Sequence, residues 1–253
     1  MTKFAPDTLS TIISGLKRLN PWVEHTGYGD EPIQLAKLLC SPCGPASEKV
    51  RFEQRLATKG RFSAGREAWN GWAQEMLDLR QIAGPESPLT IVCDALAIAD
   101  FSGFRFDDHA DFTTFVFPGR TSFAGVEFEK QAWFHSCVFQ GEAVFEQTSF
   151  VAGGVFENSA FHGPADFSNT VWMGAAEFRG VEMNGRADFS HTEFRAPAWF
   201  VGARFEAADF SGARFGDEAA FTRARRACCM RLHKSDSTSG MYSSLAFSER
   251  KRQ

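Results

Sequence analysis

The sequence has very little tyrosine and no long apolar run. Only 2 of its 253 residues are tyrosine, against 27 phenylalanines, so its aromatic side chains fill space without adding polar groups. No run of 18 apolar residues occurs, so we expect no membrane span. The first residues, MTKFAPDTLS, lack the apolar segment of a secretory signal. Six scattered cysteines form no disulfide framework. We therefore expect a reduced, cytoplasmic protein.

The sequence also lacks a basic stripe in its main body. Residues 100–226 carry 11 basic and 18 acidic side chains, a net charge of −7, whereas residues 227–253 carry 5 basic and 2 acidic ones. Binding to nucleic acid needs basic side chains that neutralise phosphates. The composition therefore argues against direct contact with nucleic acid.

The sequence does contain large apolar residues at a regular spacing. From Phe101 to Phe221 they recur at mostly alternating steps of five and six residues, and 21 of the 23 positions are Phe. The two exceptions are Trp172 and Met183. Neither the helix period of 3.6 nor the strand period of 2 produces this pattern. A fixed self-similarity of this kind predicts a stacked repeat.

Each repeat predicts one short strand and one corner. The residue two positions before each Phe is small or apolar nearly throughout, as at Ala99, Ala110 and Ala132. In an extended strand this residue and the Phe lie on the same side, so we expect both to point inward. Glycine occupies 10 of the 23 positions two residues after, including Gly103 and Gly163, where a corner needs an unusual backbone angle. Four sides of 5, 6, 5 and 6 residues make a 22-residue coil. With Ile91 and Leu96 as two earlier inward residues, about six coils form a rod roughly 29 Å tall.

These units, of the type A-D-F-S-G-A-x-F, closely resemble the pentapeptide-repeat family over about residues 89–225. The resemblance implies a mainly β fold, a right-handed quadrilateral parallel β-helix. The sequence departs from the family pattern by a sixth residue on alternate sides, for example Arg120, Pro164 and Pro197. We expect bulged corners there, and a tighter corner at Ala207–Ala208, where the extra residue is missing.

The segments outside the repeats predict helices. Residues 1–87 form an α-helical N-terminal region, with helices expected over 7–18, 31–40, 46–58 and 64–82; residues 88–225 form the β-helix, and 226–253 a C-terminal helical cap or tail. Two helices are expected at the C-terminal end, over Phe221–His233 and Tyr242–Arg252. The end of a solenoid exposes a strand edge, so the N-terminal helices either cover that end or bind separately.

Two outward-facing groups are candidate contact surfaces for a protein partner. Steps of about 22 residues align Ser122 and Val144 with four aspartates on one side of the coil: Asp100, Asp166, Asp188 and Asp209. The last three of these aspartates lie on consecutive coils. This column is either a docking strip for a basic partner or cation, or a solvated face. A second group is apolar and comprises Val116, Trp133, Val138, Val144, Val155 and Trp199. We expect it to be covered by the chain's own helices, by a partner or by a second copy of the chain.

Other chemistry is weakly indicated. Asp107, Asp108, His109 and Asp111 cluster at one corner, but the next coil offers no second metal ligand at Gln131. The pair Cys40-Ser-Pro-Cys43 has zinc-like spacing without a second pair. Cys137 faces inward and is expected to be inert. We predict no metal, no cofactor and no catalytic site.

The sequence therefore predicts a non-enzymatic scaffold that presents rigid faces to a protein partner, with Trp133 and Trp199 as anchors. The alternative rests on the family resemblance, since some members mimic duplex DNA and bind type II topoisomerases such as gyrase, modulating them or protecting them from quinolones. The aspartate column favours that alternative. The shortness of the rod and the absence of a long projecting loop count against it.

Overall fold

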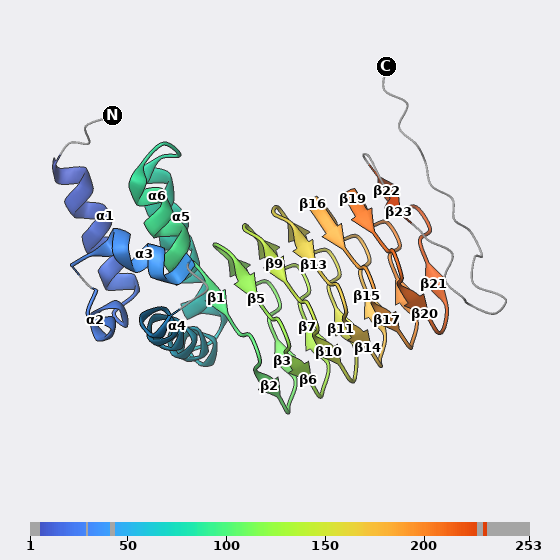
Figure 1. The fold of residues 1–253 in the computed structure, drawn as a ribbon. Coiled ribbons are helices and arrows are strands. Elements are labelled where there is room, and N and C mark those ends of the chain that lie inside the picture. Colours follow the sequence, from blue (N-terminus) through green and yellow to red (C-terminus); the bar gives the residue numbers. More distant parts are fainter. Residues whose placement is uncertain (1–5, 29, 41–43, 227–229, 232–253) are drawn as a thin grey trace, which may run out of the picture. The chain divides into compact units, whose positions relative to one another are not determined.

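The computed structural model describes residues 6–28, 30–40, 44–226 and 230–231, which divide into two compact units (Figure 1). A helical unit contains the described residues up to Asp100 together with Val116–Arg120. The second unit, the solenoid, contains Phe101–Phe115 and the described residues from Thr121 onward.

The described part of the helical unit has six helices, α1 (Pro6–Leu19), α2 (Val23–Thr26), α3 (Pro32–Cys40), α4 (Pro45–Ser63), α5 (Arg66–Ala83) and α6 (Pro88–Leu96). Helix α5 packs against α1 and α6, and α3 packs against α4 and α6. Ile12, Trp69 and Met76 are buried in this core. The four helices predicted from the sequence are confirmed, with ends that differ by a few residues.

Helix α6 corrects the predicted start of the β-helix at residue 88. Ile91 is not an inward residue of a coil, because it lies on α6 and its side chain is 60% exposed. The helix begins at Pro88, and the Ser87 hydroxyl caps it by accepting a hydrogen bond from Leu89 N at 3.1 Å. The buried residues have helical spacing: Leu89, Val92, Cys93 and Leu96. The first strand therefore begins only at Ala99.

The helical unit also includes two short strands, β1 (Ala99–Asp100) and β4 (Val116–Phe117), whose backbones are bound by helix side chains. Trp69 Nε1 donates to Val116 O at 2.9 Å, and Val116 N donates to Asn70 Oδ1 at 3.0 Å. Thr58 Oγ1 accepts from Asp100 N at 3.3 Å. Helices α4 and α5 thus satisfy polar backbone groups that an unpaired strand edge would leave open.

The strands of the solenoid form three parallel sheets. One sheet has the order β2 (Arg105–Phe106), β6 (Glu127–Phe128), β10 (Ser149–Phe150), β14 (Val171–Trp172), β17 (Glu193–Phe194), β20 (Arg214–Phe215). A second has the order β3 (Ala110–Asp111), β7 (Ala132–Trp133), β11 (Gly154–Val155), β15 (Ala176–Glu177), β18 (Ala198–Trp199), β21 (Ala219–Ala220).

The remaining sheet covers two sides of the solenoid. One series is β5 (Thr121–Ser122), β9 (Ala143–Val144), β13 (Ala165–Asp166), and the other is β8 (Val138–Phe139), β12 (Ala160–Phe161). Both series end on the longer strand β16 (Glu182–Asp188), which pairs with β19 (Arg204–Asp209). Strands β22 (Arg225–Arg226) and β23 (Met230–Arg231) pair with β19.

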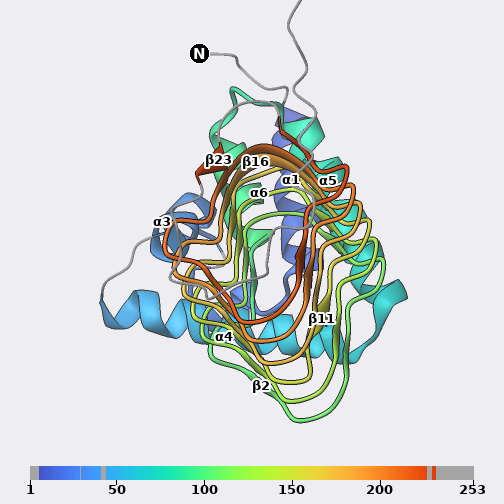
Figure 2. The same ribbon diagram turned by 90° about the vertical axis from the view of Figure 1, so that its right-hand side faces the viewer.

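Register confirms the 22-residue coil. Arg105 pairs with Glu127, and Ser149 pairs with both Glu127 and Val171, so successive coils lie on top of one another when the solenoid is viewed along its stack (Figure 2). Between β16 and β19 the register shifts by one residue, because Met183 pairs with Phe205 but Arg186 pairs with Ala207. This is the shorter corner predicted at Ala207–Ala208.

The interior consists of ring stacks that run from coil to coil. Phe156, fully buried, stacks on Phe134 at 4.6 Å and on Phe178 at 5.1 Å between ring centroids. Rings of neighbouring stacks meet edge to face, as Phe156 and Phe145 do at 5.2 Å. Trp172 takes the place of a Phe and stacks on Phe150 at 3.9 Å. Phe145, Phe167 and Phe189 are likewise fully buried, which confirms the predicted core.

The two kinds of corner use their small residues differently. At five-residue corners the second residue after the Phe has a left-handed backbone, as at Gly103 (φ 66°) and Asn158 (φ 57°), and forms a type II turn. At six-residue corners the glycine is needed instead because backbones approach closely. A Cβ on Gly163 would lie 2.6 Å from the carbonyl of Gly141 on the preceding coil. The prediction of an unusual backbone angle at Gly163 was therefore wrong.

The C-terminal end also differs from the prediction. Phe221–His233 was expected to be a helix, but Arg223 has φ 60° in one more type II turn and β22 and β23 follow. Phe221 stacks on Phe200 at 4.7 Å. The described residues up to Arg226 therefore continue the coil: Ala224 takes the small position, and Arg226 aligns with Phe205 although it is not aromatic. The helix predicted over 242–252 lies outside the described residues.

Candidate functional site

The outward residues of the β3–β21 sheet form a continuous column, which we call the tryptophan face: Asp111, Trp133, Val155, Glu177, Trp199 and Ala220. Trp133 and Val155 are register partners on adjacent coils, and Trp199 lies three coils beyond Trp133. Both tryptophans are half-buried. Both tryptophans thus lie on one face, as their spacing in the sequence predicts.

Each tryptophan is held by a neighbouring side chain. The His109 ring stacks on Trp133 with centroids 4.9 Å apart. The Arg179 guanidinium lies 4.4 Å from the centre of the Trp199 ring and pairs with Glu177 Oε2 at 2.8 Å, a cation–π arrangement that fixes the indole. Trp199 is therefore preorganised, since both its ring and the cation above it have defined positions.

The other members of the predicted apolar group lie on different sides. Val116 belongs to the helical unit. Val138, on β8, aligns with Ala160, whereas Val144, on β9, aligns with Asp166 and is only 7% exposed. The structure therefore brings Trp133, Val155 and Trp199 to one face but leaves the three valines Val116, Val138 and Val144 elsewhere.

Sequence reasoning missed an apolar corner beside the tryptophan face. It lies on the six-residue connections that lead into β11, β15 and β18, together with one residue of β14, Val171. The residues on the connections are Val151, Ala152, Met173, Ala175, Ala196 and Pro197. Met173 is 49% exposed and is the one large hydrophobic side chain in the described solenoid that is exposed to this degree. Ala152 and Gly174 stack closely, because a Cβ on Gly174 would lie 2.3 Å from the Ala152 carbonyl carbon. The signal was the absence of charge in the segments VAGGV and MGAA.

The aspartate column exists, but its carboxylates are engaged. Asp166, Asp188 and Asp209 are register partners on three consecutive coils. Each accepts a hydrogen bond from the backbone N–H two residues later, at 2.8, 2.9 and 3.0 Å respectively. Arg186 bridges Asp188 and Asp209 at 3.1 and 3.3 Å. These side chains therefore stabilise turns, and one arginine offsets part of their charge. Asp100 belongs to the helical unit.

Ion pairs along the other faces neutralise further carboxylates. Arg105 contacts Asp107 at 2.7 Å and both Glu127 and Glu129 at 2.6 Å. Arg204 pairs with Glu182 one coil earlier. These local pairs thus offset part of the negative charge of the repeats.

The other candidate sites have structural partners. Asp108 Oδ1 and Asp111 Oδ1 accept nearby backbone N–H groups at 2.8 Å, and within the described residues no group of three metal-ligand side chains assembles. Burial raises the pKa of the Cys137 thiol, which donates to Phe112 O. Burial likewise raises the pKa of Cys93 to about 11. The backbone of Cys40 ends α3, but its side chain and all of Cys43 lie outside the described residues.

A stack of parallel coils with inward aromatic residues defines the protein class as a parallel β-solenoid of about six turns, with helices before it. The family described as pentapeptide repeats (9 copies) matches residues 123–171, 167–214 and 178–225. The matched residues, 123–225, are pentapeptide repeats, and they fold as a parallel β-solenoid. Comparison with curated proteins and with solved structures gives no match. None of the helices in the described ranges has both the length and the apolar character that a membrane crossing requires.

Proposed function

We propose that the solenoid is a non-enzymatic scaffold that binds a protein partner through the tryptophan face and the adjoining apolar corner. The observation that carries this proposal is the exposed Met173 among small apolar residues, next to the face that carries Trp133 and Trp199. Aromatic and methionine side chains are enriched at protein interfaces. A contiguous exposed apolar area on a solenoid whose other faces carry ion pairs favours contact with a partner.

The packing of the solenoid supports a rigid binding surface without catalysis. Its core positions are filled by stacked rings, of which Phe128, Phe156 and Phe178 are fully buried. A substrate cavity needs concave space lined by a few convergent polar groups, and tightly packed rings provide none. The surface is also preorganised, because the strands between the ends of each sheet are fixed by parallel pairing on both sides, as β11 is between β7 and β15. Preorganisation lowers the entropy cost of association.

Affinity capture from the native cell with matched variants tests the proposal. Met173→Glu, Trp133→Ala and Trp199→Ala alter the proposed surface, and Ala160→Glu adds the same charge as the first variant on another face, on β12. We expect at least one captured protein to be lost with Met173→Glu and Trp199→Ala and kept with Ala160→Glu. Direct titration of that protein, once identified, should show at least about a tenfold loss of affinity for Trp199→Ala. Retention of every partner by all three surface variants would contradict the proposal.

A second copy of this chain is one protein that the surface could bind. Sedimentation of the wild type and of Met173→Glu distinguishes this case from a different partner. A homodimer that becomes monomeric with Met173→Glu, but not with Ala160→Glu, identifies the partner as the chain itself.

The alternative is mimicry of DNA toward a type II topoisomerase. The register of Asp166, Asp188 and Asp209 supports it, whereas the bridge from Arg186 weakens it by reducing the free charge. A gyrase supercoiling assay with and without quinolone separates the two functions. A scaffold leaves the enzyme unaffected, whereas a mimic inhibits or protects it and loses the effect when the three aspartates are replaced by asparagine.

A further inference from the structure

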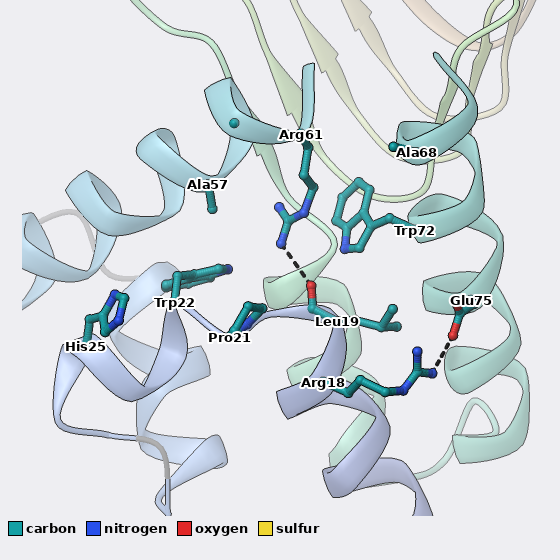
Figure 3. Close-up of a pocket in the computed structure, with 11 residues that line it drawn as sticks. Arg18, Leu19, Pro21, Trp22, His25, Ala57, Arg61, Ala68, Trp72 and Glu75 are labelled. Atoms are coloured by element: carbon teal, nitrogen blue, oxygen red, sulfur yellow. Dashed lines mark hydrogen bonds and ion pairs between the residues drawn. The ribbon is translucent and has the colours of Figure 1, made fainter. Parts of the chain in front are cut away.

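The helical unit contains an open pocket of about 560 Å³ (Figure 3). It is lined by residues from the end of α1, from the connection to α2 and α2 itself, from the C-terminal part of α4 and from the first turns of α5. Its apolar wall includes Leu19, Pro21, Trp22, Ala57 and Ala68. A volume of this size is within the range of small-molecule sites. The pocket is separate from the solenoid surface proposed above, since all its residues belong to the helical unit.

Arg61 brings a cation into this pocket without an acidic partner. Its Nη2 donates to Leu19 O at 3.2 Å and to Asn20 Oδ1 at 2.7 Å. The guanidinium lies 4.2 Å from the centre of the Trp72 ring. Among the described residues no carboxylate pairs with Arg61, so three of its five N–H donors remain available. Burial lowers the pKa of Arg61 to about 10, as expected for a cation that lacks a compensating charge.

Trp72 provides an unused donor at the same place. Its side chain is only 6% exposed, and its buried Nε1 has no hydrogen-bond partner in the part of the chain that the structure describes. In Figure 3 this nitrogen points toward the space between Arg61 and Leu19. By contrast, the other pocket indole, Trp22, donates to Asn20 Oδ1 at 3.3 Å. A buried donor without a partner destabilises the protein, and a ligand acceptor would remove that cost.

The rim excludes a highly charged anion. Arg18 is already paired with Glu75, and His25 lies 3.9 Å from Glu53. Arg61 is therefore the one pocket cation, among the described lining residues, without an acidic neighbour. A polyphosphate would need several free cations, whereas one carboxylate is matched by one guanidinium and the indole N–H. The two indoles and Pro21 supply flat apolar surface for a planar ring.

We propose that this pocket binds a small aromatic carboxylate, whose carboxylate accepts hydrogen bonds from Arg61 and Trp72 Nε1 and whose ring packs against Trp22 and Pro21. The solenoid would then belong to a chain whose helical unit senses a ligand. This inference is independent of the partner proposed for the solenoid, because its test requires no second protein.

Isothermal titration of the full chain with 2-naphthoate, with its neutral analogue 2-naphthamide and with inorganic phosphate tests the ligand class. We expect saturable binding of naphthoate, binding of the amide at least about tenfold weaker, and no measurable binding of phosphate. The factor follows from the loss of a charge-assisted hydrogen bond. With the indole nitrogens labelled by ¹⁵N, naphthoate should shift the N–H resonances of Trp72 and Trp22 and leave that of Trp199 unchanged.

Gly60→Leu blocks the pocket without removing any contact of the fold. Gly60 lines the pocket on α4, and a Cβ there meets no atom within 4 Å. Gly71→Leu is the matched control, because Gly71 lies on α5, is exposed and has the same open space. We expect Gly60→Leu to lower naphthoate affinity at least about tenfold and Gly71→Leu to leave it unchanged, while both remain folded by circular dichroism.

Two further variants examine the polar groups. Arg61→Gln should abolish the preference for naphthoate over naphthamide, and Trp72→Phe should lower naphthoate affinity without lowering thermal stability, because it removes the unpaired N–H. Three results would each overturn the proposal: no saturable binding of naphthoate, equal binding of naphthoate and naphthamide by the wild type, or undiminished binding by Gly60→Leu.

Discussion

Replacing Phe156 by alanine measures how strongly the ring stacks stabilise the solenoid. Phe156 is fully buried and has ring contacts with Phe134 and Phe178 in its own stack. Its further ring neighbours, from 5.2 to 6.3 Å between centroids, are Phe145, Phe150, Phe161, Phe167 and Trp172. Removing a buried Phe side chain costs the transfer free energy plus a cavity term, together about 3–5 kcal/mol. Rings fixed on all sides leave little room for collapse, so we expect about 4–5 kcal/mol, in the upper half of that range.

Phe215 is the matched control within the same unit. It is only partly buried, and it stacks on one ring, Phe194, at 4.9 Å. Phe215→Ala should cost roughly half as much, about 2 kcal/mol, because less apolar area leaves water there. Urea unfolding followed by circular dichroism and by tryptophan fluorescence measures both free energies. A loss below about 1 kcal/mol for Phe156→Ala, or an equal loss for both variants, would refute the reasoning.

Five further predictions concern the corners of the solenoid and the buried thiols. Gly163→Ala should lower the free energy of unfolding by about 2 kcal/mol, because its Cβ would meet the Gly141 carbonyl at 2.6 Å, and chemical denaturation measures it; a neutral result would contradict the close stacking. Gly125→Asn should cost little, since Asn158 already adopts the same left-handed turn, so a Tm lower by more than about 5 °C would be unexpected. Asp188→Ala should cost about 1 kcal/mol and Asp188→Asn much less, because asparagine keeps an acceptor for the Ser190 N–H; equal losses would mean that the charge and not the turn matters. Cys137 should resist alkylation until urea unfolds the chain, as peptide mapping can show. Because burial raises the pKa of Cys93 from its ordinary value of 9.0 to about 11, stability present below pH 9 should decline between about pH 9 and 11, and a Cys93→Ala variant should lose less over this range.

The sequence predicts the solenoid well because each repeat has the same local pattern of small and aromatic residues. Alternating small and aromatic residues place Phe145 and Phe167 inward, and the spacing of 22 aligns their coils. Even the one-residue deletion at Ala207 predicts the observed register shift. The prediction of an unusual backbone angle was wrong at Gly163, because spacing alone does not distinguish a left-handed turn from a close approach of two backbones.

The ends of the repeats were harder to predict because two patterns compete there. Residues 88–96 contain apolar residues at helical spacing that also coincide with the repeat, and the cap at Ser87 favours the helix. At the other end, Arg223 occupies a turn position usually held by a small residue. Because this segment is charged, the sequence did not predict that the coil continues there.

The surface was only partly predictable. The Trp133 and Trp199 alignment follows from strand alternation, but the apolar corner lies on connections whose side-chain exposure depends on how three coils stack. The Arg61 pocket was not predictable, because it depends on the packing of α1, α4 and α5. No short-range pattern in the sequence links Arg18, Arg61 and Trp72.

A distance between spin labels at Arg105→Cys and Arg214→Cys tests the coiled architecture most directly, after the four cysteines outside the two buried sites are replaced by serine. The two residues are joined by five register steps, through Glu127, Ser149, Val171 and Glu193. At about 4.8 Å for each step the backbones lie about 24 Å apart, so we predict a narrow distribution centred near that value. A distribution centred at more than about twice that separation would contradict parallel stacking of these strands.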